Sequence, residues 1–152
     1  MISPNHLLIS ANILIILAMH PINAFQASLT QILLFSFVFG VLVDLDLLIG
    51  MLMKKPWHHL RSWIHEPFGI ILFGIPVALM FSTIKPSYFW LTIIPYTSHV
   101  IIDYLTEHEV TPLAPFSNKT RKVGIIKSWP HKHEKIILAI STALFLILAF
   151  NY

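Results

Sequence analysis

Apolar residues recur along the chain in five long runs, each separated from the next by a more polar stretch. In windows of roughly 19 residues, the length used to detect membrane-spanning helices, the runs cover residues 7–19, 29–53, 68–84, 88–105 and 136–150. The first run is short, because a helix needs about 20 residues to cross the hydrocarbon core of a bilayer. The pattern predicts an all-α protein, a polytopic membrane helical bundle of about five transmembrane helices with a short first helix.

The composition also indicates a membrane protein rather than a soluble domain. The 152 residues include ten Lys and Arg and seven Asp and Glu, 11% in total, and 56% of the residues are hydrophobic. Soluble domains carry about 25% charged residues, so this charge is too sparse for a solvated surface. We therefore predict one membrane-embedded helical domain over residues 1–152. The absence of cysteine excludes disulfide scaffolds, thiolate zinc sites and thiol nucleophiles.

The basic residues predict an orientation in the membrane. Nine of the ten Lys and Arg residues lie in the two stretches 54–67 and 106–135, which five crossings would place on the same side. By the positive-inside rule that side is the cytoplasm, with the N-terminus on it and the C-terminus opposite. No Lys or Arg precedes the first apolar run, so we expect that run to be retained rather than cleaved as a signal peptide.

The same side carries all seven carboxylates and eight of the nine histidines. Ionisable groups at membrane depth are costly, so each is a candidate for function or for internal pairing. His99 and Asp103 are four residues apart and share one face of a helix. Asp44 and Asp46 are two apart, so they converge only if the helix ends or loosens there.

Together these residues form a candidate site for one or two divalent metal ions. A mixed nitrogen and oxygen ligand set suits zinc, manganese or iron, whereas an all-oxygen set suits magnesium or calcium. We expect zinc or manganese. The predicted ligands are Asp44, Asp46, His99 and Asp103, with His6, His59 and His65 as further ligands or as supports for the ligands.

Simpler interpretations exist for several of these residues. The spacing of His99 and Asp103 also arises by chance in helices, and the stretch around His59 could serve only to anchor the chain at the interface. The second histidine cluster, at residues 131–134, is more typical of a juxtamembrane basic segment that faces anionic lipid. The metal interpretation depends on the expected gathering of all these groups on one side of the membrane.

Several short motifs resemble the YdjM family of small inner-membrane proteins, described as LexA-binding and as metal-dependent hydrolases. The segment 98–106, Ser-His-Val-Ile-Ile-Asp-Tyr-Leu-Thr, and the downstream Pro-Phe-Ser at 115–117 are similar to its most typical motif. Asn5-His6, Val43-Asp44-Leu45-Asp46 and Arg61 through His65 are similar to three others. The sequence departs from the family pattern at Val43, Leu47, Ile64, Glu66 and Glu109. The resemblance, over residues 5 to about 117, implies an integral protein of a bacterial-type inner (plasma) membrane.

The residues and the resemblance together suggest a cytoplasm-facing, metal-dependent hydrolase for a phosphoester or lipid-linked substrate. In this hypothesis Arg61 clamps phosphate oxygens, and His65 or His108 carries a proton to the leaving group. Lys119, Arg121 and Lys122 would attract anionic substrates to the membrane surface. Membrane lipid is the expected partner, and nucleic acid is not expected because no domain remains to present the basic residues.

Two other functions fit the same residues. The first is a non-catalytic membrane module that binds metal and recruits a cytoplasmic protein, a partner that the family resemblance implies. The second is an ion or proton pathway, which is disfavoured because the ionisable residues stop at one side of the predicted bundle.

Overall fold

The computed structural model describes residues 3–20, 25–45, 52, 63–105, 111–117, 119–121 and 132–152. Within these residues the chain forms helices and no β-strand, so the all-α prediction is confirmed. The elements are α1 Ser3–Met19, α2 Leu29–Gly40, the 3-10 turns η1 Leu42–Asp44 and η3 Trp63–His65, the π-helical turn η4 Ile70–Gly74, α4 Ile75–Ser82, α5 Ser87–Tyr104 and α6 Lys132–Asn151. Their positions follow the five predicted apolar runs.

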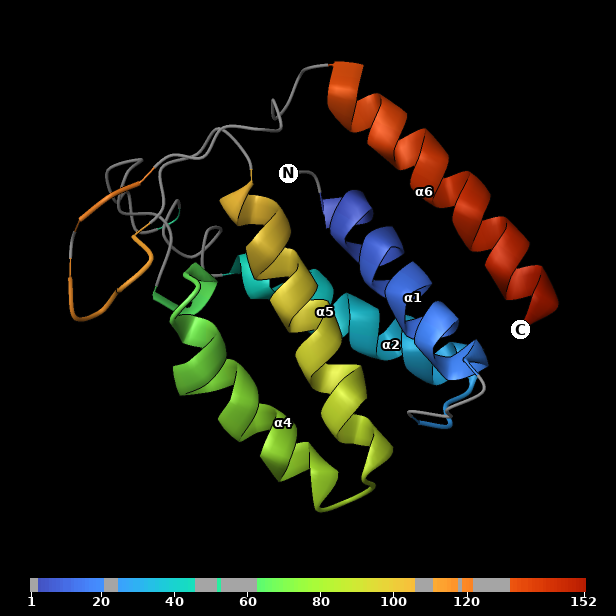
Figure 1. Cartoon of the computed structure of the whole chain (residues 1–152), viewed down its shortest axis with the longest axis horizontal. Coiled ribbons are helices and arrows are strands. Elements are labelled where there is room, and N and C mark those ends of the chain that lie inside the picture. Colours follow the sequence, from blue (N-terminus) through green and yellow to red (C-terminus); the bar gives the residue numbers. More distant parts are fainter. Residues whose placement is uncertain are drawn as a thin grey trace.

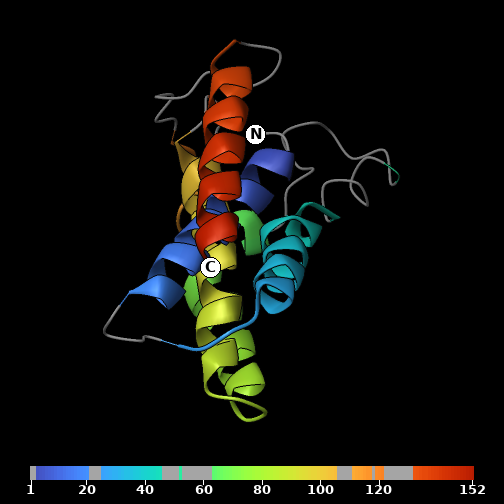
Figure 2. The ribbon, with the colours of Figure 1, turned by 90° about the vertical axis from the view of Figure 1, so that its right-hand side faces the viewer.

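The five α-helices among the described residues form a bundle in which α5 is central. It packs against α1, α2 and α4, while α6 packs along the outer side of α1 (Figure 1). In the figure α1, α4 and α6 run in one direction and α2 and α5 in the other. Figure 2 shows α6 standing alongside the rest of the bundle. The starts of α1, η3 and α6 and the ends of α2 and α5 therefore lie at the same end of the molecule.

Local sequence signals explain where the helices begin and end. Ser28 caps α2 through a capping box. The Ser28 hydroxyl accepts a hydrogen bond from the backbone N–H of Gln31, and the Gln31 side-chain oxygen accepts one from the backbone N–H of Ser28. At its other end α2 stops at Gly40 and continues as the short turn η1. Pro86 precedes α5. A proline is tolerated at the start of a helix, because its missing N–H would have no helical hydrogen-bond partner there.

The core lies between α1, α2 and α5 in the half of the bundle away from η1. Its apolar centre comprises Ala11, Leu14, Ile15, Phe25, Ile32, Phe35 and Leu91. The Phe35 ring contacts those of Phe39, Phe81 and Tyr88, with centroids 5.0 to 6.0 Å apart. This apolar packing fixes how α2 and α5 cross, and hence where their polar ends meet.

The outer faces of the helices are also apolar. Exposed residues include Leu34 on α2, Leu79 and Met80 on α4, and Ile140 and Phe150 on α6. Among the described residues one helix, His133–Asn151 with a mean hydropathy of 1.8, is long and apolar enough to cross a membrane by itself. Pro4–Met19, Leu29–Asp44 and Ile70–Ser82 are apolar but shorter. The number of crossings therefore stays a prediction.

Candidate metal centre

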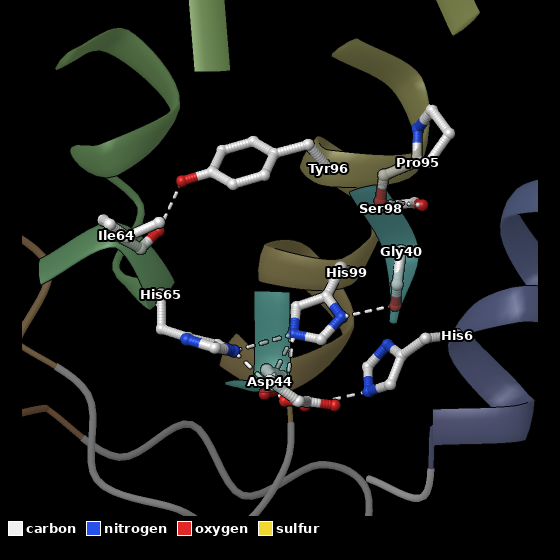
Figure 3. Close-up of polar contacts among 10 residues, drawn as sticks. His6, Gly40, Asp44, Ile64, His65, Pro95, Tyr96, Ser98 and His99 are labelled. Carbon is white, nitrogen blue, oxygen red and sulfur yellow. Dashed lines mark hydrogen bonds and ion pairs between the residues drawn. The ribbon is translucent and has the colours of Figure 1, made fainter. Parts of the chain in front are cut away.

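Four side chains from three parts of the chain meet where α2 and α5 end. Asp44 closes η1, His65 closes η3, and His99 and Asp103 lie one turn apart on α5 (Figure 3). One donor atom from each lies within 4.8 Å of the donors of the other three. The structure thus brings together four of the predicted ligands, in a group that could hold a metal ion.

The end of α2 explains why Asp44 reaches this group. The α-helix stops at Gly40, and the tighter turn of η1 carries the backbone on to Asp44. This is the loosening of the helix that the Asp-x-Asp spacing required. Asp46 itself lies outside the described residues.

His99 is held in the orientation that a metal ligand needs. Its ring is fully buried, and Nδ1 lies 2.8 Å from the carbonyl oxygen of Gly40. A carbonyl only accepts hydrogen bonds, so Nδ1 carries the proton and donates it. The lone pair of the neutral ring is then on Nε2, which points into the cluster. Metal-bound histidines are typically fixed by such a bond from the other ring nitrogen.

The spacing of the donor atoms fits a single ion. His65 Nε2 lies 3.0 Å from His99 Nε2 and 3.1 Å from Asp44 Oδ1. His99 Nε2 lies 3.5 Å from Asp44 Oδ1 and 3.7 Å from Asp103 Oδ2. A tetrahedral ion with ligand bonds of about 2.1 Å separates neighbouring donors by about 3.4 Å. These four separations bracket this value, and all four donor atoms lie within 4.8 Å of one another. The group combines Asp44, His99 and Asp103, three of the first-named predicted ligands, with His65, which was predicted as a further ligand or support.

Burial in the cluster is uneven. The side chains of His65, His99 and Asp103 are at most 1% exposed, whereas that of Asp44 is 25% exposed. Among the described members, Asp44 therefore forms the open edge of the site.

Tyr96 supports His65 through the backbone of the preceding residue. Its side chain is buried one turn before His99 on α5, and its hydroxyl donates to the backbone carbonyl of Ile64, the residue before His65 (Figure 3). On the other side of His65, the buried Glu66 carboxylate accepts a hydrogen bond of 2.7 Å from the backbone N–H of Thr111. The short turn η3 is thereby fixed to the central helix and to the segment 111–117.

Replacing Tyr96 by phenylalanine should weaken metal binding without unfolding the bundle. A hydrogen bond contributes about 1 kcal/mol, so we expect affinity for zinc to fall about fivefold as His65 loses its support. The measurement is a zinc titration against a competing chelator. Tyr88→Phe is the matched control, since that hydroxyl accepts from Gln31 at the far end of the bundle. Equal affinities in the two variants would contradict the role of Tyr96.

Gly40 allows the helices to approach closely enough for these contacts. A Cβ atom on Gly40 would lie 3.0 Å from Ser10 Oγ, 3.6 Å from the His6 carbonyl oxygen and 3.7 Å from Pro95 Cβ. Ser10 has little freedom to move, because its hydroxyl donates to the His6 carbonyl at 2.6 Å. Gly40 thus brings α1 and α5 against α2 and also supplies the carbonyl that orients His99.

His6 lies beside the four-residue group rather than in it. Its buried Nε2 is 3.3 Å from Asp103 Oδ1, and its ring lies over that of His99 with centroids 4.0 Å apart. Asp103 therefore presents one carboxylate oxygen to His6 and the other to His99. This position suits a residue that holds Asp103 in place.

The remaining predicted site residues lie outside the described part of the chain. They are Asp46, His59, Arg61 and His108, so their distances to the cluster stay predictions. Of the basic residues expected to attract anionic substrates, Lys119 and Arg121 are exposed, and Lys122 lies outside the described residues.

Several residues that shape this region were not singled out in the sequence. Gly40 and Tyr96 act through backbone contacts, which leave no motif. Glu66 was noted only as a departure from the family pattern, and its hydrogen bond with Thr111 could not be foreseen from that. Glu134 lies in the segment interpreted as juxtamembrane and basic, and its side chain is 1% exposed. The backbone carbonyl of Glu134 accepts a hydrogen bond of 3.4 Å from the Asn5 side chain. Two turns further along α6, the Ser141 carbonyl accepts one from the Asn12 side chain. Polar side chains thus join α1 to α6.

Comparison with known protein families matches residues 1–152 to the model described as YdjM inner membrane protein. The chain belongs to the YdjM family. The resemblance drawn from short motifs is confirmed, and the match extends it to the whole chain. Neither the curated proteins nor the solved structures give a match. The YdjM description places the family in the inner membrane, which agrees with the apolar outer faces of α2, α4 and α6.

Proposed function

We propose that this YdjM-family protein is a membrane-embedded metal-dependent hydrolase with a cytoplasm-facing site, acting on a phosphoester or lipid-linked substrate. The observation that carries the proposal is the group of two imidazoles and two carboxylates, three of them buried and Asp44 partly exposed, with one donor atom of each within 4.8 Å of the others. Burying such ionisable groups inside an apolar bundle costs free energy, so they are candidates for function. An ion would also offset the repulsion between the two carboxylates.

The proposal includes five membrane crossings with the N-terminus in the cytoplasm. The alternating directions of α1, α2, α4, α5 and α6 support it, as do their exposed apolar residues (Figure 1). The ends that carry the cluster adjoin the basic stretches 54–67 and 106–135, which the positive-inside rule assigns to the cytoplasm. The shorter helices would cross within the bundle, where neighbouring helices and local thinning of the bilayer accommodate them.

Zinc or manganese fits the donor set best, because the cluster combines neutral imidazole nitrogens with carboxylate oxygens. Asp44, His65, His99 and Asp103 would hold the ion, and Asp46 and His59 are candidates for completing one or two sites. When bound, a divalent ion lowers the pKa of a coordinated water and polarises a substrate oxygen. His99 would keep its lone pair on the ion through its bond to Gly40, and His6 would orient Asp103.

Residues around the ion would bind the substrate and move a proton. The guanidinium of Arg61 would donate hydrogen bonds to the equatorial oxygens of a phosphoester. It would also stabilise the negative charge that develops on these oxygens during attack. Because His65 Nε2 points into the cluster, His65 suits the role of ligand better than that of proton carrier. His108 is therefore the stronger candidate for donating a proton to the leaving group. Exposed Lys119 and Arg121 would attract anionic head groups.

Metal analysis and turnover, measured on the same purified protein, test this function. We expect at least one equivalent of zinc or manganese, and hydrolysis of bis(p-nitrophenyl) phosphate or short-chain phosphatidic acid that a chelator stops and the ion restores. Lys85→Ala, at the opposite end of the bundle, should behave as wild type. Bound metal without turnover would instead favour the module that recruits a cytoplasmic protein. Absence of metal would mean that the cluster is joined by a shared proton on His65 Nε2.

A further inference from the structure

An apolar groove lies between the end of α2 with η1 on one side and the turns η3 and η4 on the other, next to the metal centre. It has a volume of about 260 Å³ and is lined by Val38, Phe39, Leu42, Val43, Ile64 and Phe73. All six lining residues are apolar. The groove therefore offers a ligand no hydrogen-bond partner among these side chains, and it suits a hydrocarbon.

Two lining residues immediately precede residues of the metal centre. Val43 precedes Asp44 in η1, and Ile64 precedes His65 in η3. Tyr96 holds the Ile64 carbonyl, so the same contact fixes one wall of the groove and one member of the cluster. Asp44, on the η1 side, is also the partly exposed edge of the cluster. The groove and the open side of the cluster thus share the same turn.

The elements that form the groove also carry exposed apolar residues. Leu34 and Phe37 on α2 are 56% and 46% exposed, and Ile71 on η4 is 55% exposed. In a bilayer these residues would face lipid chains. A lipid chain could therefore move sideways from the bilayer into the groove without passing a polar surface.

We propose that this groove binds one hydrocarbon chain of an amphiphilic phosphoester whose head group lies at the Asp44, His65, His99 and Asp103 cluster. The inference rests on the proposed function and narrows its substrate to a lipid phosphoester. Pockets for drug-sized ligands occupy about 300–1,000 Å³, so this smaller groove suits part of a slim chain rather than a whole lipid. The charged head group and the apolar chain would each meet a matching surface.

Binding of non-hydrolysable n-alkylphosphonates tests the proposal without requiring turnover. Zinc-loaded protein in nanodiscs is titrated with phosphonates of two, four, six and eight carbons, and empty nanodiscs provide the partitioning baseline. Each methylene buried in the groove should raise affinity about three- to fourfold. Val38→Trp fills the groove, so this variant should retain zinc while the dependence on chain length disappears. Ile140→Trp, on α6, where Ile140 is 62% exposed and outside the groove, is the matched control and should behave as wild type.

The outcomes separate the groove from the proposed function. Affinity that depends on zinc but not on chain length, in wild type and in both variants, would overturn the groove and leave the metal site standing. Affinity that rises with chain length without zinc, and is lost in Val38→Trp, would support the groove and contradict a metal-dependent phosphoesterase. Absence of binding above the empty-nanodisc baseline at every chain length would overturn both.

Discussion

Replacing His99 by alanine is expected to remove the bound metal and, with it, all metal-dependent turnover. A structural zinc site contributes about 10–16 kcal/mol over four ligands, or roughly 3 kcal/mol for each. Since 1.4 kcal/mol is a tenfold change, zinc affinity should fall by at least about 100-fold. The loss should be large because the Gly40 carbonyl already directs the His99 lone pair at the ion. Zinc titration and metal content of the purified variant measure the effect.

Two further variants make the His99 result specific. His99→Asn keeps a short amide that can reach the Gly40 carbonyl but lacks the Nε2 ligand atom, so it should lose metal as His99→Ala does. His133→Ala removes an exposed histidine from α6 and should bind metal as wild type. Full zinc affinity in His99→Asn would mean that His99 supports the fold and does not bind the ion.

Removing the metal should lower thermal stability. Three almost fully buried polar residues face one another in the cluster, and an ion that binds only the folded bundle stabilises it by RT ln(1 + [L]/Kd). At a free zinc concentration 100 times the Kd this is about 2.7 kcal/mol. For a chain of this size the midpoint should then rise by about 5–10 °C.

The measurement compares thermal unfolding in detergent with chelator and with added zinc. His99→Asn is the internal control, because zinc should leave its midpoint unchanged. A zinc-induced rise of equal size in wild type and in His99→Asn would place the stabilising ion elsewhere in the protein.

The sequence predicted the helices well because their signals are local. The apolar runs are read from adjacent residues, and the boundary signals found in the structure, the Ser28 capping box of α2 and Pro86 before α5, are local as well. The proximity of His99 and Asp103 could also be predicted from the sequence, since residues four apart on a helix lie on one face. These features needed no knowledge of how the helices pack.

Other parts of the site depend on tertiary packing and could not be predicted. Nothing in the sequence near Gly40 indicates that its carbonyl meets His99, which is 59 residues away. The same holds for Tyr96 and the backbone of Ile64. Glu134 is a further example, because its neighbours His133 and Lys135 are exposed while its own side chain is buried, and its backbone carbonyl accepts from Asn5 of α1. Burial between helices is decided by the partner helix.

The contact between Gly40 and His99 has a consequence for assembly of the protein. Before the helices pack together, the donor atoms of Asp44 on η1, His65 on η3 and His99 on α5 would lie far apart, and His99 would have no fixed tautomer. An ion could bind the cluster only after α2 has packed against α5 at Gly40, so metal binding would be a late event that depends on helix association. The metal content of a preparation would therefore report the fraction of molecules whose bundle has closed correctly.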